Sequence, residues 1–158
     1  MNYSFLQKTV TLSLIVTSFF ACGNLERSTV DVLENPPLTI EQYLSDNNIQ
    51  NAIETKEGIY IQIEKEGTTE KPRVSSKVTI HYKGYLLDHT VFDQTEGEAR
   101  TYPLGALIAG WQIGIPYIGK GGKCKLIIPP HLGYGSNDVG PIPGNSILVF
   151  DIELEDFN

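Results

Sequence analysis

The chain has few of the side chains that bind metals or form disulfides. Its 158 residues include two cysteines, three histidines, one methionine and one tryptophan. The histidines, His81, His89 and His131, are scattered without the spacing that metal ligands have. Neither a catalytic triad nor a cluster of ligands is apparent. We therefore expect a protein that works without a metal and without a cofactor.

Positive charge is also scarce. Lys and Arg number 12 against 19 Asp and Glu, which gives a formal net charge of −7 at pH 7. An acidic chain is a poor match for the phosphates of nucleic acids and for anionic membrane surfaces. We expect no nucleic-acid partner, and surface charges that mainly keep the protein in solution. The length suits one domain and a leader.

No apolar run is long enough for a stable membrane-spanning helix. The longest, residues 10–20, has the length of the apolar part of a secretory signal, and Lys8 precedes it. Residues 1–21 are therefore predicted to be a signal peptide. The segment around Cys22 resembles a bacterial lipoprotein signal, which implies that Cys22 carries lipid after cleavage. The alternative is an ordinary signal peptide followed by an incidental cysteine.

The residue after Cys22 bears on where such a lipoprotein resides. It is Gly23 rather than Asp, and this resembles the signals for outer-membrane sorting in a Gram-negative envelope. We expect a lipid-anchored protein of the cell envelope, in the outer membrane. The other cysteine, Cys124, lies between two lysines that could lower its pKa. The alternating pattern around it favours the simpler interpretation, a small apolar residue on the inner face of a strand.

A tether and a short helix are predicted between the anchor and the main domain. Residues 24–37 lack a periodic pattern and end in Asn35-Pro36-Pro37, as an extended linker would. Thr39 can cap a helix over residues 39–48, with Gln42 in the capping-box position. One face of this helix would be apolar, with Ile40, Tyr43 and Leu44. We expect this helix to dock on the main domain, and the alternative is that it docks on a partner. Residues 22–55 thus form the anchored tether.

From residue 56 onward, apolar residues alternate with polar ones, the pattern of half-buried strands. Residues 110–117 can form one short helix, broken at Pro116. Residues 133–144 form a long loop rich in Gly and Pro, and loops of that length tend to be functional. These features predict an α+β domain over residues 56–158, with an antiparallel sheet of about five strands wrapped on one short helix. The predicted strands lie within residues 59–64, 77–85, 86–93, 123–128 and 147–155.

One stretch, residues 102–111, contains the single tryptophan, Trp111, and the apolar pair Leu107-Ile108 among small residues. Bulky groups on a backbone that others can approach closely could form the wall and floor of an apolar pocket. Alternatively, the stretch is a loop leading into a core helix whose Trp is simply packed. Taken alone, the stretch favours the second interpretation, because single Trp residues are usually core.

Five motifs stand in order along the domain. They are Val78-Thr79-Ile80-His81-Tyr82-Lys83-Gly84, Val91-Phe92-Asp93, Leu107-Ile108-Ala109-Gly110-Trp111, Gly133-Tyr134-Gly135, and Ile147-Leu148-Val149-Phe150-Asp151-Ile152-Glu153-Leu154. Together they resemble the FKBP-type peptidyl-prolyl isomerases, over about residues 57–157. The resemblance implies the same sheet-on-helix fold and cis/trans isomerisation of X-Pro bonds in proline-containing polypeptides. It also implies that the family's macrolide inhibitors are ligands. We expect a monomer.

The resemblance assigns a role to each cavity residue. Trp111 would be the floor under the prolyl ring, and Leu107 would line the entrance. Asp93 would accept a hydrogen bond from Tyr82, although a turn-forming Asp is the competing interpretation. The walls would be Tyr82, Phe92 and Phe150. The Ile108 N–H and the Tyr134 hydroxyl would donate hydrogen bonds to substrate carbonyls. Ile142, from the long loop, would cover the pocket. Plain core packing is the alternative for the aromatic side chains.

Two departures from the family pattern affect selectivity: residues 94–101 are shorter than in the family's best-known small members, and residues 134–150 are slightly contracted. Arg100 stands where an aromatic wall residue is common, so it is a further expected substrate-binding residue. The Arg that commonly partners the pocket Asp has no clear counterpart, and Arg100 could substitute for it. A different class of function also stays open, that of a non-catalytic chaperone or assembly module that binds extended, Pro-containing chains. Retention of the cavity residues together favours the enzyme.

Overall fold

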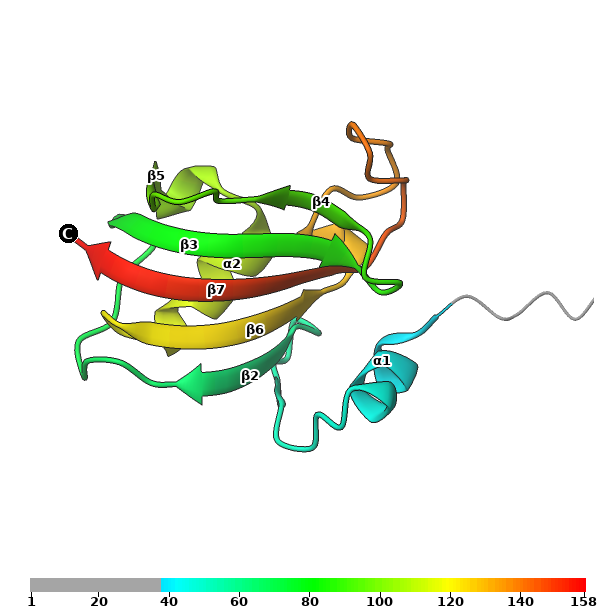
Figure 1. Ribbon diagram of the computed structural model, residues 1–158, viewed down its shortest axis with the longest axis horizontal. Coiled ribbons are helices and arrows are strands. Elements are labelled where there is room, and N and C mark those ends of the chain that lie inside the picture. Colours follow the sequence, from blue (N-terminus) through cyan, green and yellow to red (C-terminus); the bar gives the residue numbers. More distant parts are fainter. Residues whose placement is uncertain (1–37) are drawn as a thin grey trace, which may run out of the picture. The chain divides into compact units, whose positions relative to one another are not determined.

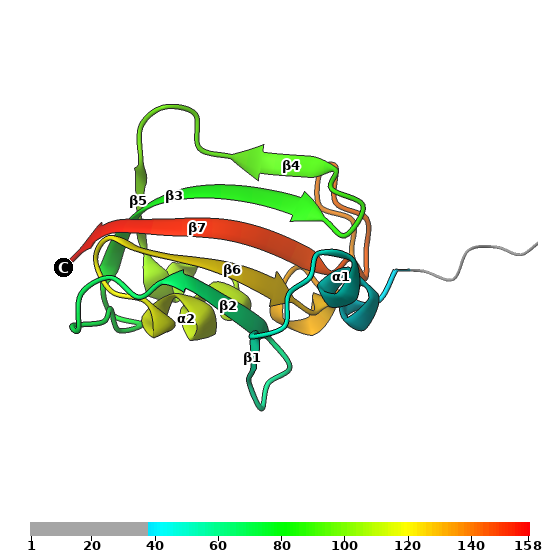
Figure 2. The ribbon, with the colours of Figure 1, turned by 60° about the horizontal axis from the view of Figure 1, so that its bottom comes forward.

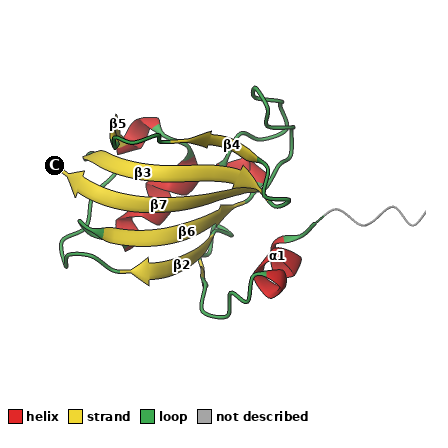
Figure 3. Cartoon of the chain, viewed as in Figure 1, coloured by secondary structure: helices red, strands yellow, loops and turns green. Residues whose placement is uncertain are grey.

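The computed structural model describes residues 38–158, which form a curved antiparallel sheet with a short helix against one face (Figures 1 and 3). The predicted signal peptide, the lipid site Cys22 and the tether up to residue 37 lie outside the described residues. Within them, no helix has the length and apolarity needed to cross a membrane. The helices and strands are α1 Ile40–Asp46, β1 Ile53–Glu54, β2 Tyr60–Lys65, β3 Lys77–Leu86, β4 Val91–Gln94, β5 Arg100–Pro103, α2 Ala109–Gly114, β6 Gly122–Ile128 and β7 Leu148–Phe157.

The sheet confirms the predicted α+β architecture. Its strand order is β1-β2-β6-β7-β3-β4, every pairing is antiparallel, and β5 pairs with the first half of β3. The sheet has seven strands rather than about five, because the short strands β1 and β5 join it. With two and four residues, these strands are too short for an alternating pattern to reveal them. The long strands β3 and β7 form the centre.

The inner face of the sheet packs on α2 (Figure 2). Side chains of one parity along β3, such as Val78 and Ile80, are fully buried there. The helix approaches closely because it carries glycine at the contact: a Cβ on Gly110 would lie 2.5 Å from Ile128 Cγ2. Cys124 belongs to the same core, and its burial raises the pKa of its thiol to about 12. The prediction that Cys124 is a small apolar residue on the inner face of a strand is thus confirmed.

The helix α1 packs on the outer face of the sheet. Tyr43 and Ile49 are buried there against Tyr85, Ile127 and Val149, which alternate with the inward side chains of β3, β6 and β7. The packed unit therefore includes α1 and begins before residue 56. The hydroxyl of Thr39 caps the helix by accepting from Gln42 N–H at 3.2 Å. The side chain of Gln42 donates instead to Asp46, so half of the capping box forms.

Candidate active site

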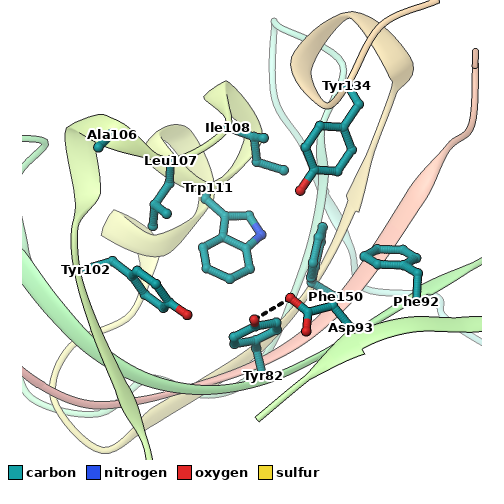
Figure 4. A pocket seen from close by; sticks show the side chains of 10 residues that line it. All are labelled: Tyr82, Phe92, Asp93, Tyr102, Ala106, Leu107, Ile108, Trp111, Tyr134 and Phe150. Carbon is teal, nitrogen blue, oxygen red and sulfur yellow. Dashed lines mark hydrogen bonds between the residues drawn. The ribbon is translucent and has the colours of Figure 1, made fainter. Parts of the chain in front are cut away.

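A cavity of about 300 Å³ opens between the start of α2 and the strands β3, β4 and β5 (Figure 4). The residues that line it come from five separate segments of the chain, which only the folded sheet brings together. The cavity is lined by Tyr82, Phe92, Asp93, Tyr102, Ala106, Leu107, Ile108, Trp111, Tyr134 and Phe150.

The floor of the cavity is a cluster of aromatic rings in edge-to-face contact. The Trp111 ring lies 5.1 Å from that of Tyr82 and 5.0 Å from that of Phe150, with interplanar angles of 74° and 84°. Phe92 meets Phe150 at 5.5 Å and 82°. Edge-to-face geometry is favourable because the positive ring edge meets the negative face. Each ring therefore fixes the orientation of the next, and the floor is preorganised.

The indole nitrogen of Trp111 is the one buried side-chain polar atom that lacks a hydrogen-bond partner within residues 38–158. Figure 4 shows this nitrogen on the side of Phe150. The nitrogen itself is buried, so the indole does not offer a hydrogen-bond donor to the cavity. The floor therefore presents apolar surface to whatever enters the cavity.

The one acid of the cavity is held by a tyrosine. The Tyr82 hydroxyl donates to Asp93 Oδ2 at 2.5 Å, which is the hydrogen bond expected from the sequence. Burial, followed by this bond to a carboxylate, raises the pKa of Tyr82 well above its ordinary value. Tyr82 is consequently a protonated donor throughout the physiological range. Asp93 sits on the edge strand β4, opposite Gly84 of β3, and its side chain is exposed to the cavity opening.

Two further groups that can donate hydrogen bonds belong to residues that line the cavity. Ile108 precedes the first turn of α2, and its N–H makes no hydrogen bond to another backbone group of the described chain. The Tyr134 hydroxyl points into the cavity from the loop after β6 (Figure 4). Partial burial, and to a lesser degree Asp93, raises the pKa of Tyr134, so it also stays protonated. Such donors suit a ligand with two carbonyl groups. No group of three or more His, Cys, Asp or Glu residues within 38–158 is placed to hold a metal ion.

Comparison with known proteins agrees with this geometry. The sequence model of the FKBP-type peptidyl-prolyl cis-trans isomerase family matches residues 68–155. The chain belongs to this family. It is 47% identical over 113 residues to the FKBP-type isomerase FkpA of Buchnera aphidicola subsp. Schizaphis graminum, covering 70% of this chain and 45% of the relative. It is 46% identical over 101 residues to FkpA of Escherichia coli K12, covering 63% of this chain and 37% of the relative. The FKBP chain described here thus spans about half the length of the curated relatives that it matches.

Solved structures of FKBP proteins have the same fold. The crystal structure of FkpA from Escherichia coli superposes with a TM-score of 0.69 at 40% identity, covering 75% of this chain and 57% of that one. A peptidyl-prolyl isomerase from Pseudomonas syringae superposes with a TM-score of 0.67 at 28% identity, covering 75% of this chain and 90% of that one. The FKBP domain of this protein therefore has the sheet-on-helix fold that the sequence resemblance implied.

The structure brings most of the expected FKBP site residues together and separates two. Ile142 does not line the cavity: it is 5% exposed and belongs to the inner core. A bridge between Val139 and Ile142, and the bond from Gly144 N–H to Asp138 Oδ1, fold this part of the loop so that Ile142 turns inward. The residues that do line the cavity as expected are Tyr82, Phe92, Asp93, Leu107, Ile108, Trp111, Tyr134 and Phe150.

Arg100 is the second residue that the structure places outside the cavity lining. It is exposed on β5, and no carboxylate of the described residues lies within ion-pair distance of it. The hypothesis that Arg100 substitutes as the ion-pair partner of Asp93 is therefore wrong. Two lining residues, Tyr102 and Ala106, had no individual role assigned from the sequence, although both lie in the stretch 102–111 that was considered as the wall and floor of a pocket. Tyr102 is the first residue of the stretch that ends at the single Trp, and its aromatic ring was the feature of the sequence that could have identified it as a wall residue.

A glycine beneath the aromatic walls leads to a testable expectation. A Cβ on Gly84 would lie 2.5 Å from Phe92 Cε2 and 2.6 Å from Phe150 Cε1. Gly84→Ala is expected to push both rings away and to destabilise the fold by about 1–3 kcal/mol. The measurement is denaturant unfolding, with peptide affinity as a second readout. The double variant Gly84→Ala/Phe92→Leu relieves one clash and should recover part of the stability. An unchanged midpoint in Gly84→Ala would show that the rings yield freely.

Proposed function

We propose that this FKBP chain is a peptidyl-prolyl cis-trans isomerase that accelerates rotation about X-Pro bonds in polypeptides. The observation that carries the proposal is the cavity of about 300 Å³, which has an aromatic floor and separate hydrogen-bond donors at its rim. A flat apolar ring with a carbonyl on either side is the ligand that such a cavity fits, and a prolyl residue within a peptide has this shape.

The chemistry follows from the nature of the barrier. Amide resonance holds the X-Pro bond planar with a barrier of about 18–20 kcal/mol, so uncatalysed rotation takes tens of seconds or more. A catalyst must bind the twisted amide more tightly than the planar one. The twisted amide has lost resonance and part of its charge separation, so a water-poor aromatic environment favours it. Trp111 and Phe150, both nearly fully buried, supply that environment.

The polar groups orient the substrate. The Ile108 N–H and the Tyr134 hydroxyl would each donate to a carbonyl beside the proline, which holds the chain on both sides of the rotating bond. Asp93, fixed by Tyr82, would set the electric field at the twisting carbonyl. Rotation forms and breaks no covalent bond, so these groups bind and orient rather than react.

The test is the rate of cis-to-trans conversion in short X-Pro peptides, measured by NMR exchange with the full chain and with a chain lacking residues 1–36. We expect a clear acceleration above the uncatalysed rate, and competition by a macrolide inhibitor of the family at the same cavity. A folded chain that accelerates no peptide, whatever residue precedes the proline, would overturn the proposal. Peptide binding without acceleration would favour the non-catalytic chaperone.

We also propose that the protein works in the bacterial envelope, anchored to the outer membrane by lipid on Cys22, as a monomer. The support is the pattern of residues 1–23, an apolar run that ends at Cys22-Gly23. Metabolic labelling with a fatty acid should be lost in Cys22→Ser. The matched control is Cys124→Ser, which removes the other cysteine from the buried core and should keep the label. Label that persists in Cys22→Ser would reject this anchor.

A further inference from the structure

Arg100 and Tyr102 project from β5 toward the face of the sheet that bears the cavity. In the β3–β5 register, Arg100 lies opposite Ile80 and Tyr102 opposite Val78. Both β3 residues are fully buried on the inner face. Residues opposite one another in an antiparallel pair share a face, as do residues two apart along a strand. The Arg100 side chain therefore rises on the cavity side of the sheet, next to a wall residue.

Tyr102, two residues along the same strand from Arg100, lines the cavity. Figure 4 shows its hydroxyl pointing toward Tyr82, on the side of the cavity opposite Tyr134. The nearby Tyr102 side chain is the main reason why the pKa of Arg100 is raised, with smaller contributions from Tyr82 and Asp93. Arg100 is exposed, and its side chain stands beside the part of the cavity wall that Tyr102 forms.

The charge of Arg100 is not neutralised by the protein. No Asp or Glu of residues 38–158 lies within 4.0 Å of it. It is also the only Lys or Arg between Lys83 and Lys120, the stretch that supplies most of the cavity. The acid of the cavity, Asp93, is on β4 and already accepts from Tyr82. The rim thus has an unpaired cation on one side and an engaged anion on the other.

We propose that Arg100 is a specificity-determining residue that recognises an acidic side chain next to the substrate proline, and that Tyr102 is a positioning residue that orients its guanidinium. The inference rests on the proposed prolyl isomerase function. The planar fork of an arginine matches a carboxylate and binds it through two parallel hydrogen bonds. An acidic side chain on the Asp93 side of the cavity would be repelled, so it would bind on the β5 side.

The experiment compares peptides that differ only beside the proline. One set has Glu, Gln or Lys before it and a second set has them after it, and NMR exchange gives kcat/KM with the full chain. We expect Glu to be preferred over Gln by about two- to fivefold in one of the sets, the effect of one exposed ion pair. Lys should be the poorest of the three. The preference should fade at high salt, because exposed pairs are screened.

The variants separate this role from a general effect on the fold. Arg100→Gln should equalise Glu and Gln, Arg100→Lys should keep a smaller preference, and Tyr102→Phe should lower it. Arg73→Gln removes an exposed arginine outside the cavity lining, and so should retain the full preference. Equal rates for Glu and Gln peptides in the wild type, or a preference that survives Arg100→Gln, would overturn the inference.

Failure of the proposed function has a different signature. In that case no peptide is accelerated, including those with Gln. The affinities of the same peptides, measured by NMR titration, then decide the inference by themselves. Tighter binding of the Glu peptide that depends on Arg100 supports it, and equal binding of Glu and Gln peptides rejects it.

Discussion

Replacing Asp93 with Val is expected to lower kcat/KM for X-Pro rotation by roughly one to two orders of magnitude. The carboxylate accepts the 2.5 Å hydrogen bond from Tyr82, and its removal leaves the hydroxyl of this buried residue without that acceptor. Bonds to charged groups contribute about 1.5–3 kcal/mol. The field that Asp93 exerts on the twisting carbonyl is lost as well. Valine suits a strand, so β4 should persist. Peptide exchange kinetics with a variant shown to be folded give the result.

Two companion variants identify which property of Asp93 matters. Asp93→Asn keeps an acceptor for Tyr82 and removes the charge, whereas Tyr82→Phe keeps the charge and removes the donor. If the field dominates, Asn should lose nearly as much activity as Val. If positioning dominates, Asn should stay near the wild type and Tyr82→Phe should lose most. A Val variant with more than half of the wild-type kcat/KM would exclude Asp93 from the chemistry.

The long elements of this fold could be predicted because their patterns are long. Ten-residue strands such as β3 and β7 contain stretches in which buried side chains alternate with more exposed ones, which period two reveals. The end of α2 was also readable, since Pro116 cannot continue a helix, and a 3₁₀ turn over Ile115–Tyr117 follows Gly114 there. Strands β1 and β5 were not readable, because pairing with a neighbour, not local pattern, makes them strands.

The site was predictable to the extent that its residues sit at fixed offsets within motifs. Trp111 and Ile108 are three residues apart at the start of one helix, and Phe92 and Asp93 are adjacent on one strand. Ile142 was not predictable in this way. It lies in a long loop whose path depends on the Val139–Ile142 bridge and on the Asp138 side chain, and neither is encoded by a periodic pattern.

Tyr43→Ala should destabilise the domain by about 3–5 kcal/mol, the cost of deleting a large buried aromatic ring. This is a large share of the roughly 5–15 kcal/mol that holds a domain folded. Tyr43 is 3% exposed, and it is the residue of α1 that is buried against the outer face of the sheet. The measurement is the free energy of unfolding by denaturant. The control Tyr43→Phe keeps the ring and removes only the hydroxyl bond to Tyr85 at 3.2 Å, for a loss of about 1 kcal/mol.

This helix contact supports the strand on which the active site is built. The Tyr85 hydroxyl accepts from Lys125 at 2.7 Å, and Lys125, only 15% exposed, also pairs with Asp151. Removing the Tyr43 ring would admit water to this half-buried cation and loosen the outer face of β3. The inner face of the same strand carries Tyr82, which fixes Asp93. Tyr43→Ala should therefore lose activity at a lower temperature than Tyr43→Phe, in step with unfolding. Wild-type stability in Tyr43→Ala would mean that α1 rests on the sheet without contributing to the folded unit.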